Sequence, residues 1–226
     1  MNEFRPSRFD ILPPVIKNLL IINVIIYFAQ ITLENPRYGI EVNQLFALHS
    51  WQSPHYHWWQ LLTHMFMHGS FSHLFFNMFT LWMFGNVIEN IWGQNRFLFF
   101  YFMCGLAAAI VHLSYLTFVY EQSSTFINGQ LVRYYDDSST LGASGAIAGI
   151  IAAFIYYFPN SFIYIYFFIP VKAKWLGLIY FGYELFSGLT NFSHDNVAHW
   201  AHLGGGLAGF IIVLLWNKNK RNNNFY

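Results

Sequence analysis

The sequence predicts an all-α membrane protein, a bundle of six transmembrane helices with a long structured loop between the first helix and the second. Hydrophobic residues make up 56% of the 226 residues and charged residues only 9%, and the mean hydropathy is +0.37. Six apolar runs approach the length of about 20 residues that a helix needs to cross a bilayer. Together these observations indicate one compact membrane domain.

The predicted spans alternate with more polar connections. We expect a membrane domain over 15–216, between a cytoplasmic N-terminal segment, 1–14, and a cytoplasmic tail, 217–226. The fourth span is expected to continue with a kink before Pro170. The spans are predicted at 15–31, 71–92, 97–120, 141–158, 175–190 and 197–216.

Two connections differ in composition. Residues 32–70 are rich in Trp, His and Tyr and are too polar for a further span. Trp and Tyr favour the membrane–water interface, so this stretch is predicted to be a structured loop that lies half in the outer interface. Residues 121–140 show no clear period and predict an irregular polar loop.

Lys and Arg predict the orientation, because cytoplasmic loops carry an excess of positive charge. With the N-terminus inside, nine of these residues fall on the inner side and two on the outer side. Residues 1–14 show no signal or transit peptide. We therefore expect a multi-pass protein of the bacterial plasma (inner) membrane with both termini in the cytoplasm. The inner set is Arg5, Arg8, Lys17, Arg96, Lys172, Lys174, Lys218, Lys220 and Arg221, and the outer set is Arg37 and Arg133.

Charge and cysteine content argue against nucleic-acid binding and against an intramolecular disulfide. The formal net charge is +1 and no basic run occurs, so nucleic acid is not an expected partner. Cys104 is the single cysteine and cannot form an intramolecular disulfide. Membrane lipid is the expected surrounding.

Three polar residues are predicted to lie at one depth in the membrane. Spans two, four and six all run from outside to inside, and His73, Ser144 and His202 each lie about three to five residues after the start of one of them. At about 1.5 Å of rise per residue they share a shallow layer on the outer side. Such side chains are costly in hydrocarbon unless they line a wet cavity.

Two runs of small residues predict that spans four and six touch. Gly145 and Gly149 in span four, and Gly205 and Gly209 in span six, each form the Gly-xxx-Gly pattern that lets membrane helices approach closely. Contact between these faces would bring Ser144 beside a histidine of span six. The alternative for Ser144 alone is a small residue that only packs at a helix interface.

Two histidines of span six are candidates for a general base. His199 and His202 lie three residues apart on one helical face, and this reasoning leaves both open. The hydroxyl of Ser144 is a weak nucleophile until a base removes its proton, and histidine suits that task near neutral pH. The alternative is a buried histidine bonded to a carbonyl group.

His73 and Asn77 are candidates for stabilising an oxyanion. They lie four residues apart and share a helix face, and both can donate hydrogen bonds to the oxyanion that forms when Ser144 attacks a carbonyl carbon. The alternative is interhelical hydrogen bonding with a structural role. A nucleophile, a base and two donors in one layer predict acyl transfer, the hydrolysis of an amide or ester.

The remaining polar groups near the membrane have weaker interpretations. His64, His68 and His73 cluster in the sequence, but no His-Glu-x-x-His motif or nearby carboxylate accompanies them, so no metal and no cofactor are expected. His64 and His68 are expected to hydrogen-bond the outer loop or to hold water. Glu184 is an ionisable group inside span five and is interpreted as a structural hydrogen-bonding acid near the bundle interior.

With these motifs the chain resembles the rhomboid intramembrane serine proteases in their basic six-helix form, over about 15–216. The resemblance selects His202 over His199, because the family's base motif has glycines at fixed distances after its histidine. The motifs that carry the resemblance are Trp59 to His68, His73-xxx-Asn77, Gly142-x-Ser144-Gly145 and His202-Leu-Gly-Gly205-xxx-Gly209.

The resemblance implies a serine endopeptidase with a Ser144–His202 dyad and no third acid. It implies an oxyanion hole made by the Ser144 backbone N–H with His73 and Asn77, and a structural role for Glu89. The implied substrates are single-span transmembrane proteins that are cut near the outer ends of their helices. The residues given supporting roles are Gly142, Gly145, Gly205, Gly209 and His68.

Two positions depart from the family's pattern. The family usually has Trp-Arg where this chain has Trp59-Gln60. Arginine makes more hydrogen bonds in a fixed geometry, so we expect the loop to be anchored differently. Many members carry an aromatic ring that stacks on the base four residues after the serine, where this chain has Ala148. We therefore expect His202 to be held by another residue, such as Trp200 or a neighbour, or to be held more loosely.

Two other functions share part of this pattern. A catalytically weak or inactive rhomboid-like protein would bind transmembrane clients without cutting them, but both members of the dyad are present here. A small transporter or channel would need a continuous polar stripe through the membrane. The inner halves of spans two, four and six are instead rich in Leu, Ile, Phe and Ala.

Overall fold

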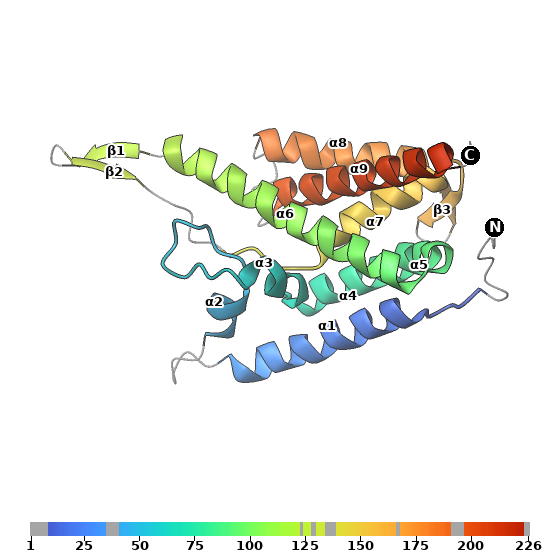
Figure 1. Ribbon diagram of the computed structural model, residues 1–226. Helices are drawn as coiled ribbons and strands as arrows, with labels where there is room; N and C mark the ends of the chain where they lie inside the picture. Colours follow the sequence, from blue (N-terminus) through green and yellow to red (C-terminus); the bar gives the residue numbers. More distant parts are fainter. Residues whose placement is uncertain are drawn as a thin grey trace.

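The computed structural model is a bundle of helices lying side by side (Figure 1), and it describes residues 9–34, 41–122, 124–127, 130–133, 139–165, 168–190 and 197–223. The long helices run along the bundle, whereas the short helices α2 and α3 gather at one end. The helices and helical turns are α1 (Pro14–Leu33), α2 (Val42–Phe46), α3 (Gln60–Thr63), η2 (His64–Phe66), α4 (Phe71–Thr80), η3 (Leu81–Gly85), α5 (Asn86–Trp92), α6 (Gln94–Gln122), α7 (Ser144–Tyr157), α8 (Ala173–Thr190) and α9 (His199–Asn223).

Every predicted span contains helix. Among the described residues, α1, α6 and α9 are long and apolar enough to cross a membrane by length and composition, and α7 is a shorter apolar helix. The predicted span at 71–92 consists of three consecutive pieces, α4, η3 and α5, so a π-helical turn lies in its middle. Such turns are rare in helices and are frequent at functional sites.

Two connections form β-hairpins, so the all-α prediction is wrong there. β1 (Ser124–Ile127) pairs antiparallel with β2 (Gln130–Arg133) inside the predicted irregular loop, and β3 (Phe162–Ile165) pairs with β4 (Ile169–Lys172). Because α7 ends at Tyr157 and Pro170 lies in β4, the predicted helix kink is also wrong. β-Branched and aromatic residues favour such strands, and both strands of a two-stranded hairpin are edges that tolerate proline.

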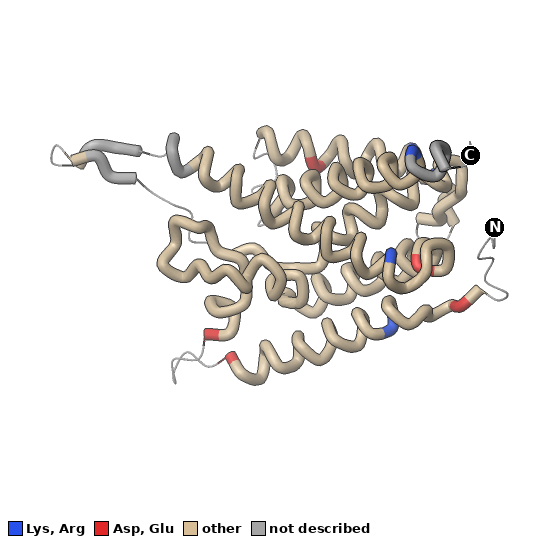
Figure 2. Tube along the Cα trace, in the orientation of Figure 1, with Lys and Arg blue, Asp and Glu red and all other residues tan. Residues whose placement is uncertain are grey.

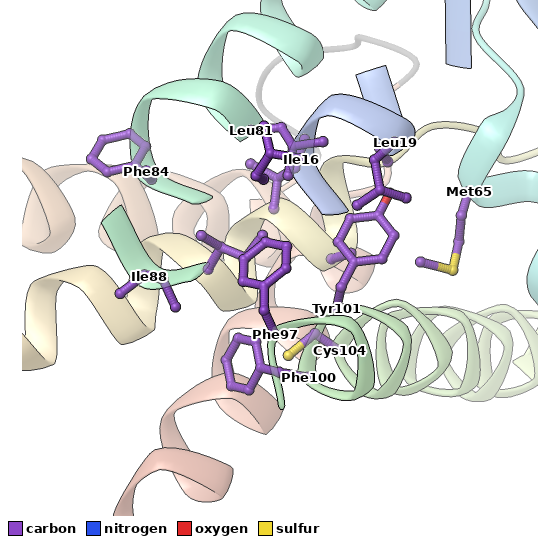
Figure 3. Packing of buried hydrophobic residues seen from close by; sticks show 14 of the residues in the cluster. Ile16, Leu19, Met65, Leu81, Phe84, Ile88, Phe97, Phe100, Tyr101 and Cys104 are labelled. Carbon is purple, nitrogen blue, oxygen red and sulfur yellow. The ribbon is translucent and has the colours of Figure 1, made fainter. Parts of the chain in front are cut away.

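The main hydrophobic core joins α1, α5 and α6, as Figure 3 shows. Phe97, Phe100 and Tyr101 of α6 cluster with Ile16 of α1 and Ile88 of α5, and all five side chains are fully buried. Many other large apolar side chains on α1 and α8 are exposed. So extensive an apolar surface suits a helix bundle that faces lipid.

The helices α7 and α9 are in direct backbone contact, which confirms the prediction from their glycines. A methyl group added to Gly209 would lie 2.7 Å from the Cα atom of Gly149. One added to Gly205 would overlap the carbonyl group of Gly145. Larger residues at these positions would therefore force the two helices apart.

Gln60, where the family usually has an arginine, anchors the segment between α1 and α4. Its side chain is fully buried, and its Nε2 group donates to the carbonyl oxygens of His55 at 2.9 Å and Gln44 at 3.0 Å. Its Oε1 atom accepts the backbone N–H groups of His49 and His57, each at 3.2 Å. One amide therefore joins three parts of the loop through backbone groups.

Glu89 of α5 fastens the start of α1. Its two carboxylate oxygens accept the backbone N–H groups of Val15 at 2.9 Å and Ile16 at 2.8 Å. These are two of the N–H groups that a helix leaves unpaired at its N-terminus, and the negative charge also suits the positive end of the helix dipole. The structural role implied by the resemblance therefore has a clear physical basis.

The described Lys and Arg residues gather at the end of the bundle where α1 begins and α9 ends (Figure 2). Lys17, Arg96 and Lys174 lie near the starts of α1, α6 and α8 respectively. These described cations thus lie at one end of the bundle, and the side of the membrane that this end faces stays a prediction. The orientation prediction also used residues that lie outside the described ones. These are Arg5, Arg8 and Arg37, and the side chains of Arg133, Lys220 and Arg221.

The contact between α7 and α9 predicts that Gly205→Ala lowers the free energy of unfolding by about 1–3 kcal/mol, the usual cost of overpacking. The measurement is the thermal unfolding midpoint of the purified protein in detergent. The matched control is Gly182→Ala in α8, where an added methyl group meets nothing within 4 Å, so the midpoint stays or rises because alanine favours helix. Equal losses in both variants would contradict the close contact.

Candidate active site

Ser144 is the first residue of α7 and follows a glycine turn. Gly142 has a φ angle of +128°, a conformation that side chains with a Cβ atom rarely adopt. Its N–H group donates to the carbonyl oxygen of His64 at 2.9 Å. The capping residue Ala143 makes no side-chain hydrogen bond, so nothing from the cap covers the first N–H groups of α7, which point toward any anion at this helix end.

His202 of α9 lies against Ser144. The distance from His202 Nε2 to Ser144 Oγ is 2.8 Å, which is a hydrogen bond. His199, one turn earlier on α9, has its Nδ1 atom 2.7 Å from a carboxylate oxygen of Glu184. The structure thus separates the two histidines that spacing alone left open.

Glu184 of α8 brings a carboxylate to both histidines. Its Oε1 atom lies 2.9 Å from His202 Nδ1 and its Oε2 atom lies 2.7 Å from His199 Nδ1. Its side chain is only 6% exposed. The resemblance implies a dyad without a third acid, and the structure adds a carboxylate beside the base: Ser144, His202 and Glu184 form a continuous hydrogen-bonded row.

Tyr180, rather than Trp200, lies beside His202. The ring centroids of Tyr180 and His202 are 6.4 Å apart with an interplanar angle of 31°. The Trp200 indole instead donates to the Gly188 carbonyl oxygen at 3.2 Å and stacks on Tyr115. The expectation for Trp200 is wrong because residues two apart on a helix do not face the same side.

Local hydrogen bonds orient His73 at the start of α4. The hydroxyl of Ser70 caps the helix by accepting the His73 backbone N–H at 3.1 Å. The Gly69 N–H group donates to His73 Nδ1 at 3.4 Å. Since Nδ1 accepts, the ring proton of a neutral His73 is on Nε2, which is then a hydrogen-bond donor.

The donor atoms of His73 and Asn77 converge on the glycine turn before Ser144. A methyl group added to Gly142 would lie 2.9 Å from His73 Nε2 and 3.6 Å from Asn77 Nδ2. Asn77 is buried, and its Nδ2 atom has no hydrogen-bond acceptor among the described residues. Buried donors are nearly always paired, so this amide is ready to bind an acceptor that enters the site.

A cavity of about 630 Å³ joins these groups. Ser144, His202, His73 and Asn77 all line it, so α4, α7 and α9 contribute polar side chains to one space inside an apolar bundle. A cavity of this size can hold part of a peptide chain. The three helix starts thus border one cavity, whereas their common depth in the membrane stays a prediction.

His64 and His68 lie in the segment between α1 and α4, beside the cavity. His68 packs against His73 with ring centroids 5.1 Å apart, and Gln30 of α1 bonds both its backbone N–H, at 3.1 Å, and its carbonyl oxygen, at 3.0 Å. His64 Nδ1 lies 2.8 Å from the Gln60 carbonyl oxygen. Over the described ranges, no three His, Cys, Asp or Glu side chains group as ligands for a metal.

The sequence of this helical bundle with a serine–histidine pair is similar to those of known proteins. The family model of the rhomboid domain matches residues 55–219, which is more than half of the chain. The chain belongs to the rhomboid family. It is accordingly a membrane protein of a family that includes serine proteases.

Three relatives illustrate the similarity. RHOMBOID-like protein 12, mitochondrial, of Arabidopsis thaliana is 30% identical over 79% of this chain and 51% of its own length. Rhomboid protease AarA of Providencia stuartii is 29% identical over 88% of this chain and 70% of its own length. Putative rhomboid protease YdcA of Bacillus subtilis (strain 168) is 27% identical over 72% and 69%. The chain thus matches about half of the plant protein and somewhat more than two thirds of the two bacterial ones.

Sequence reasoning missed the bonding of Glu184. A pointer was present, because a lone ionisable group inside an apolar run is a candidate functional residue. Its partner could not be named, since hydropathy does not show how α8 is rotated about its axis. The sequence shows Gln60 only as a departure from the family's pattern, and its five backbone partners depend on the folded loop.

The loop histidines predict that the fold is sensitive to acid. Burial lowers the pKa of His64 from 6.5 to about 4, and burial together with the neighbouring His73 lowers the pKa of His68 from 6.5 to about 4. The unfolded chain takes up these protons near pH 6.5, whereas the folded chain resists them until about pH 4. Stability is therefore full above pH 6.5 and is lost as the pH falls toward 4.

The measurement is thermal unfolding in detergent at about pH 7.5 and about pH 5, where we expect the midpoint to fall by roughly 5–10 °C. His64→Gln removes one titrating group and reduces the difference between the two midpoints. A midpoint that does not change with pH in the wild type would refute this prediction.

Proposed function

We propose that this protein is an intramembrane serine protease that hydrolyses peptide bonds in or near the transmembrane helices of other membrane proteins. The observation that carries the proposal is the 2.8 Å hydrogen bond between Ser144 Oγ and His202 Nε2 beside a polar cavity. A hydroxyl paired with an imidazole is the arrangement that activates a serine nucleophile. Membership of the rhomboid family supports the same reaction.

The first half of the reaction makes an acyl-enzyme. Ser144 Oγ attacks the carbonyl carbon of the peptide bond, and its proton passes to His202 Nε2. The tetrahedral intermediate that results then loses its C–N bond, and the departing nitrogen takes the proton from Nε2. The N-terminal part of the substrate remains joined to Ser144 as an ester.

The second half consumes water. A water molecule gives a proton to His202 Nε2 and attacks the ester carbon, and Ser144 Oγ recovers that proton when the new carboxylic acid leaves. Because a membrane interior contains no bulk water, the reaction depends on the cavity beside Ser144. That cavity lies at the start of α7, toward the end of the bundle that holds the outer loop in this proposal.

Three donors are assigned to the oxyanion of the intermediate. They are the backbone N–H of Ser144, the Nε2–H of His73 and the amide of Asn77. The position of the first at the start of α7 adds the favourable end of the helix dipole. The convergence of the other two beside Gly142 supports the assignment. A donor that has no partner before the reaction acts most strongly on the charge that develops.

The proposed topology has six spans, formed by α1, α4 to α5, α6, α7, α8 and α9, within a membrane domain over 15–216. Both termini are placed in the cytoplasm, because described Lys and Arg residues gather at the end where α1 begins and α9 ends. A bacterial plasma membrane is the proposed location. The proposed substrates are single-span proteins, which reach the site from the surrounding lipid.

The nucleophile is tested with a fluorophosphonate probe on the protein in detergent. We expect the wild type to be labelled and Ser144→Ala and His202→Ala to remain unlabelled, because only an activated serine reacts. The matched control is Ser114→Ala, whose hydroxyl only donates to the Ile110 carbonyl oxygen on α6 and whose loss leaves labelling intact.

Labelling that persists in Ser144→Ala would exclude this nucleophile. A folded wild type that neither takes the label nor cleaves a transmembrane substrate would favour a rhomboid-like protein that binds clients without cutting them.

The oxyanion assignment predicts that Asn77→Ala lowers kcat by about 10²–10³-fold, the usual loss for one donor. The substrate KM changes little, since the donor acts on the transition state. The measurement is the initial rate of cleavage of a fluorescent transmembrane substrate in proteoliposomes. Asn86→Ala is the control, because Asn86 lies in the same predicted span as Asn77 but outside the cavity lining. Its amide donates to the Ile11 carbonyl oxygen. A kcat for Asn77→Ala equal to that of the control would argue against an oxyanion role.

A further inference from the structure

We infer that Glu184 is the positioning residue for the base, holding His202 in the one tautomer and orientation that can accept the Ser144 proton. This inference rests on the function proposed above and deepens it, since the family resemblance gives the base no acidic partner. Its basis is a row of atoms, Ser144 Oγ, His202 Nε2, His202 Nδ1 and Glu184 Oε1, joined by hydrogen bonds of 2.8 and 2.9 Å.

The carboxylate determines which nitrogen of His202 carries the proton. An ionised carboxylate only accepts hydrogen bonds, so the 2.9 Å contact with Nδ1 requires a proton on that atom. Nε2 then has a free lone pair, and the hydrogen in reach is that of the Ser144 hydroxyl. The other tautomer would direct two lone pairs at each other and an N–H group at the serine, and that imidazole could not act as the base.

The same contact stabilises the charge that the reaction creates. When Nε2 takes the serine proton, His202 becomes an imidazolium ion next to the carboxylate. The side chains of His202 and Glu184 are only 13% and 6% exposed, so water screens their attraction weakly. Glu184 keeps its charge throughout and takes no proton in the reaction.

His199 holds the carboxylate from its other side. Its Nδ1 atom lies 2.7 Å from Glu184 Oε2, so each carboxylate oxygen has its own histidine. Because His199 and His202 are three residues apart on α9, both reach the acid from one helix face. A buried carboxylate is costly without partners. The second hydrogen bond offsets that cost and keeps the acid from rotating away from the base.

The other titratable groups around His202 cannot take this role. Tyr180 of α8 lies beside the His202 ring and also interacts with the Glu184 carboxylate. His73 of α4 faces the base across the cavity. A tyrosine or a histidine is neutral or positive near neutral pH, so the negative charge in this group of residues comes from Glu184.

The test compares Glu184→Gln, Glu184→Asp and the control Glu89→Gln in proteoliposomes with a fluorescent transmembrane substrate. Glu184→Gln keeps the shape of the side chain and removes its charge, so we expect kcat to fall by about 10²–10⁴-fold, by analogy with soluble serine proteases, at nearly unchanged KM. Glu184→Asp restores the charge and recovers part of the rate. Glu89→Gln, the same exchange in α5, loosens the hydrogen bonds to the start of α1, so it lowers the unfolding midpoint and leaves kcat unchanged.

An acid that only joins α8 to α9 would give the opposite result. Glu184→Gln would then lower the unfolding midpoint and leave kcat of the folded protein unchanged, and aspartate would not restore a rate that had not been lost. That outcome would overturn the inference while the labelled Ser144 still supported the proposed protease.

A second measurement does not depend on activity. Nitrogen NMR of the protein with ¹⁵N-labelled histidine, with the His202 signals assigned by their loss in His202→Ala, is expected to show protonated Nδ1 and unprotonated Nε2 in the wild type and a changed tautomer in Glu184→Gln. A wild type without protease activity would refute the proposed function alone, because the tautomer is still read. A His202 ring protonated on Nε2 in the wild type would refute the role of Glu184 whatever the activity.

Discussion

The backbone contact between α7 and α9 sets the distance on which the site depends. Ser144 immediately precedes Gly145, and His202 lies three residues before Gly205, so each reactive side chain is next to a residue that lets the helices touch. Two short side chains on neighbouring helices can form a 2.8 Å hydrogen bond only if the helix axes approach closely. Helices in lipid lack a hydrophobic drive to associate and rely on such packing. The packing that holds the bundle together thus also aligns nucleophile and base.

Hydrogen bonding inside an apolar bundle explains much of the rest. Ser144, His202, Glu184 and His199 form one row in which each member has a partner, and a complete buried network is stable where a partial one is costly. Asn77 is different, because its Nδ2 atom has no acceptor among the described residues. The four hydrogen-bonded residues keep their geometry without a substrate. The Asn77 amide, in contrast, gains a hydrogen bond when a substrate binds.

The sequence allowed much of this to be predicted, and the limits have physical causes. Hydropathy located helix in every predicted span, and the glycine spacing correctly brought α7 to α9. The bonding of Glu184 could not be predicted, because the few polar side chains of α8 do not fix its rotation, which is set by packing. The hairpin that contains Pro170 was missed, since short apolar strands resemble the end of a span in hydropathy. The backbone partners of Gln60 depend on loop turns that have no period.

Gln60 affects how the stability of the loop between α1 and α4 depends on salt. An arginine at this place would hold the loop through a charge, whose effect depends on the counterions and lipid headgroups nearby. The amide of Gln60 bonds five backbone groups with no net charge of its own. Dissolved salt does not screen neutral hydrogen bonds. The hydrogen bonds of Gln60 therefore hold the loop beside the cavity equally well at low and at high salt concentration, even though the neighbouring histidines respond to acid.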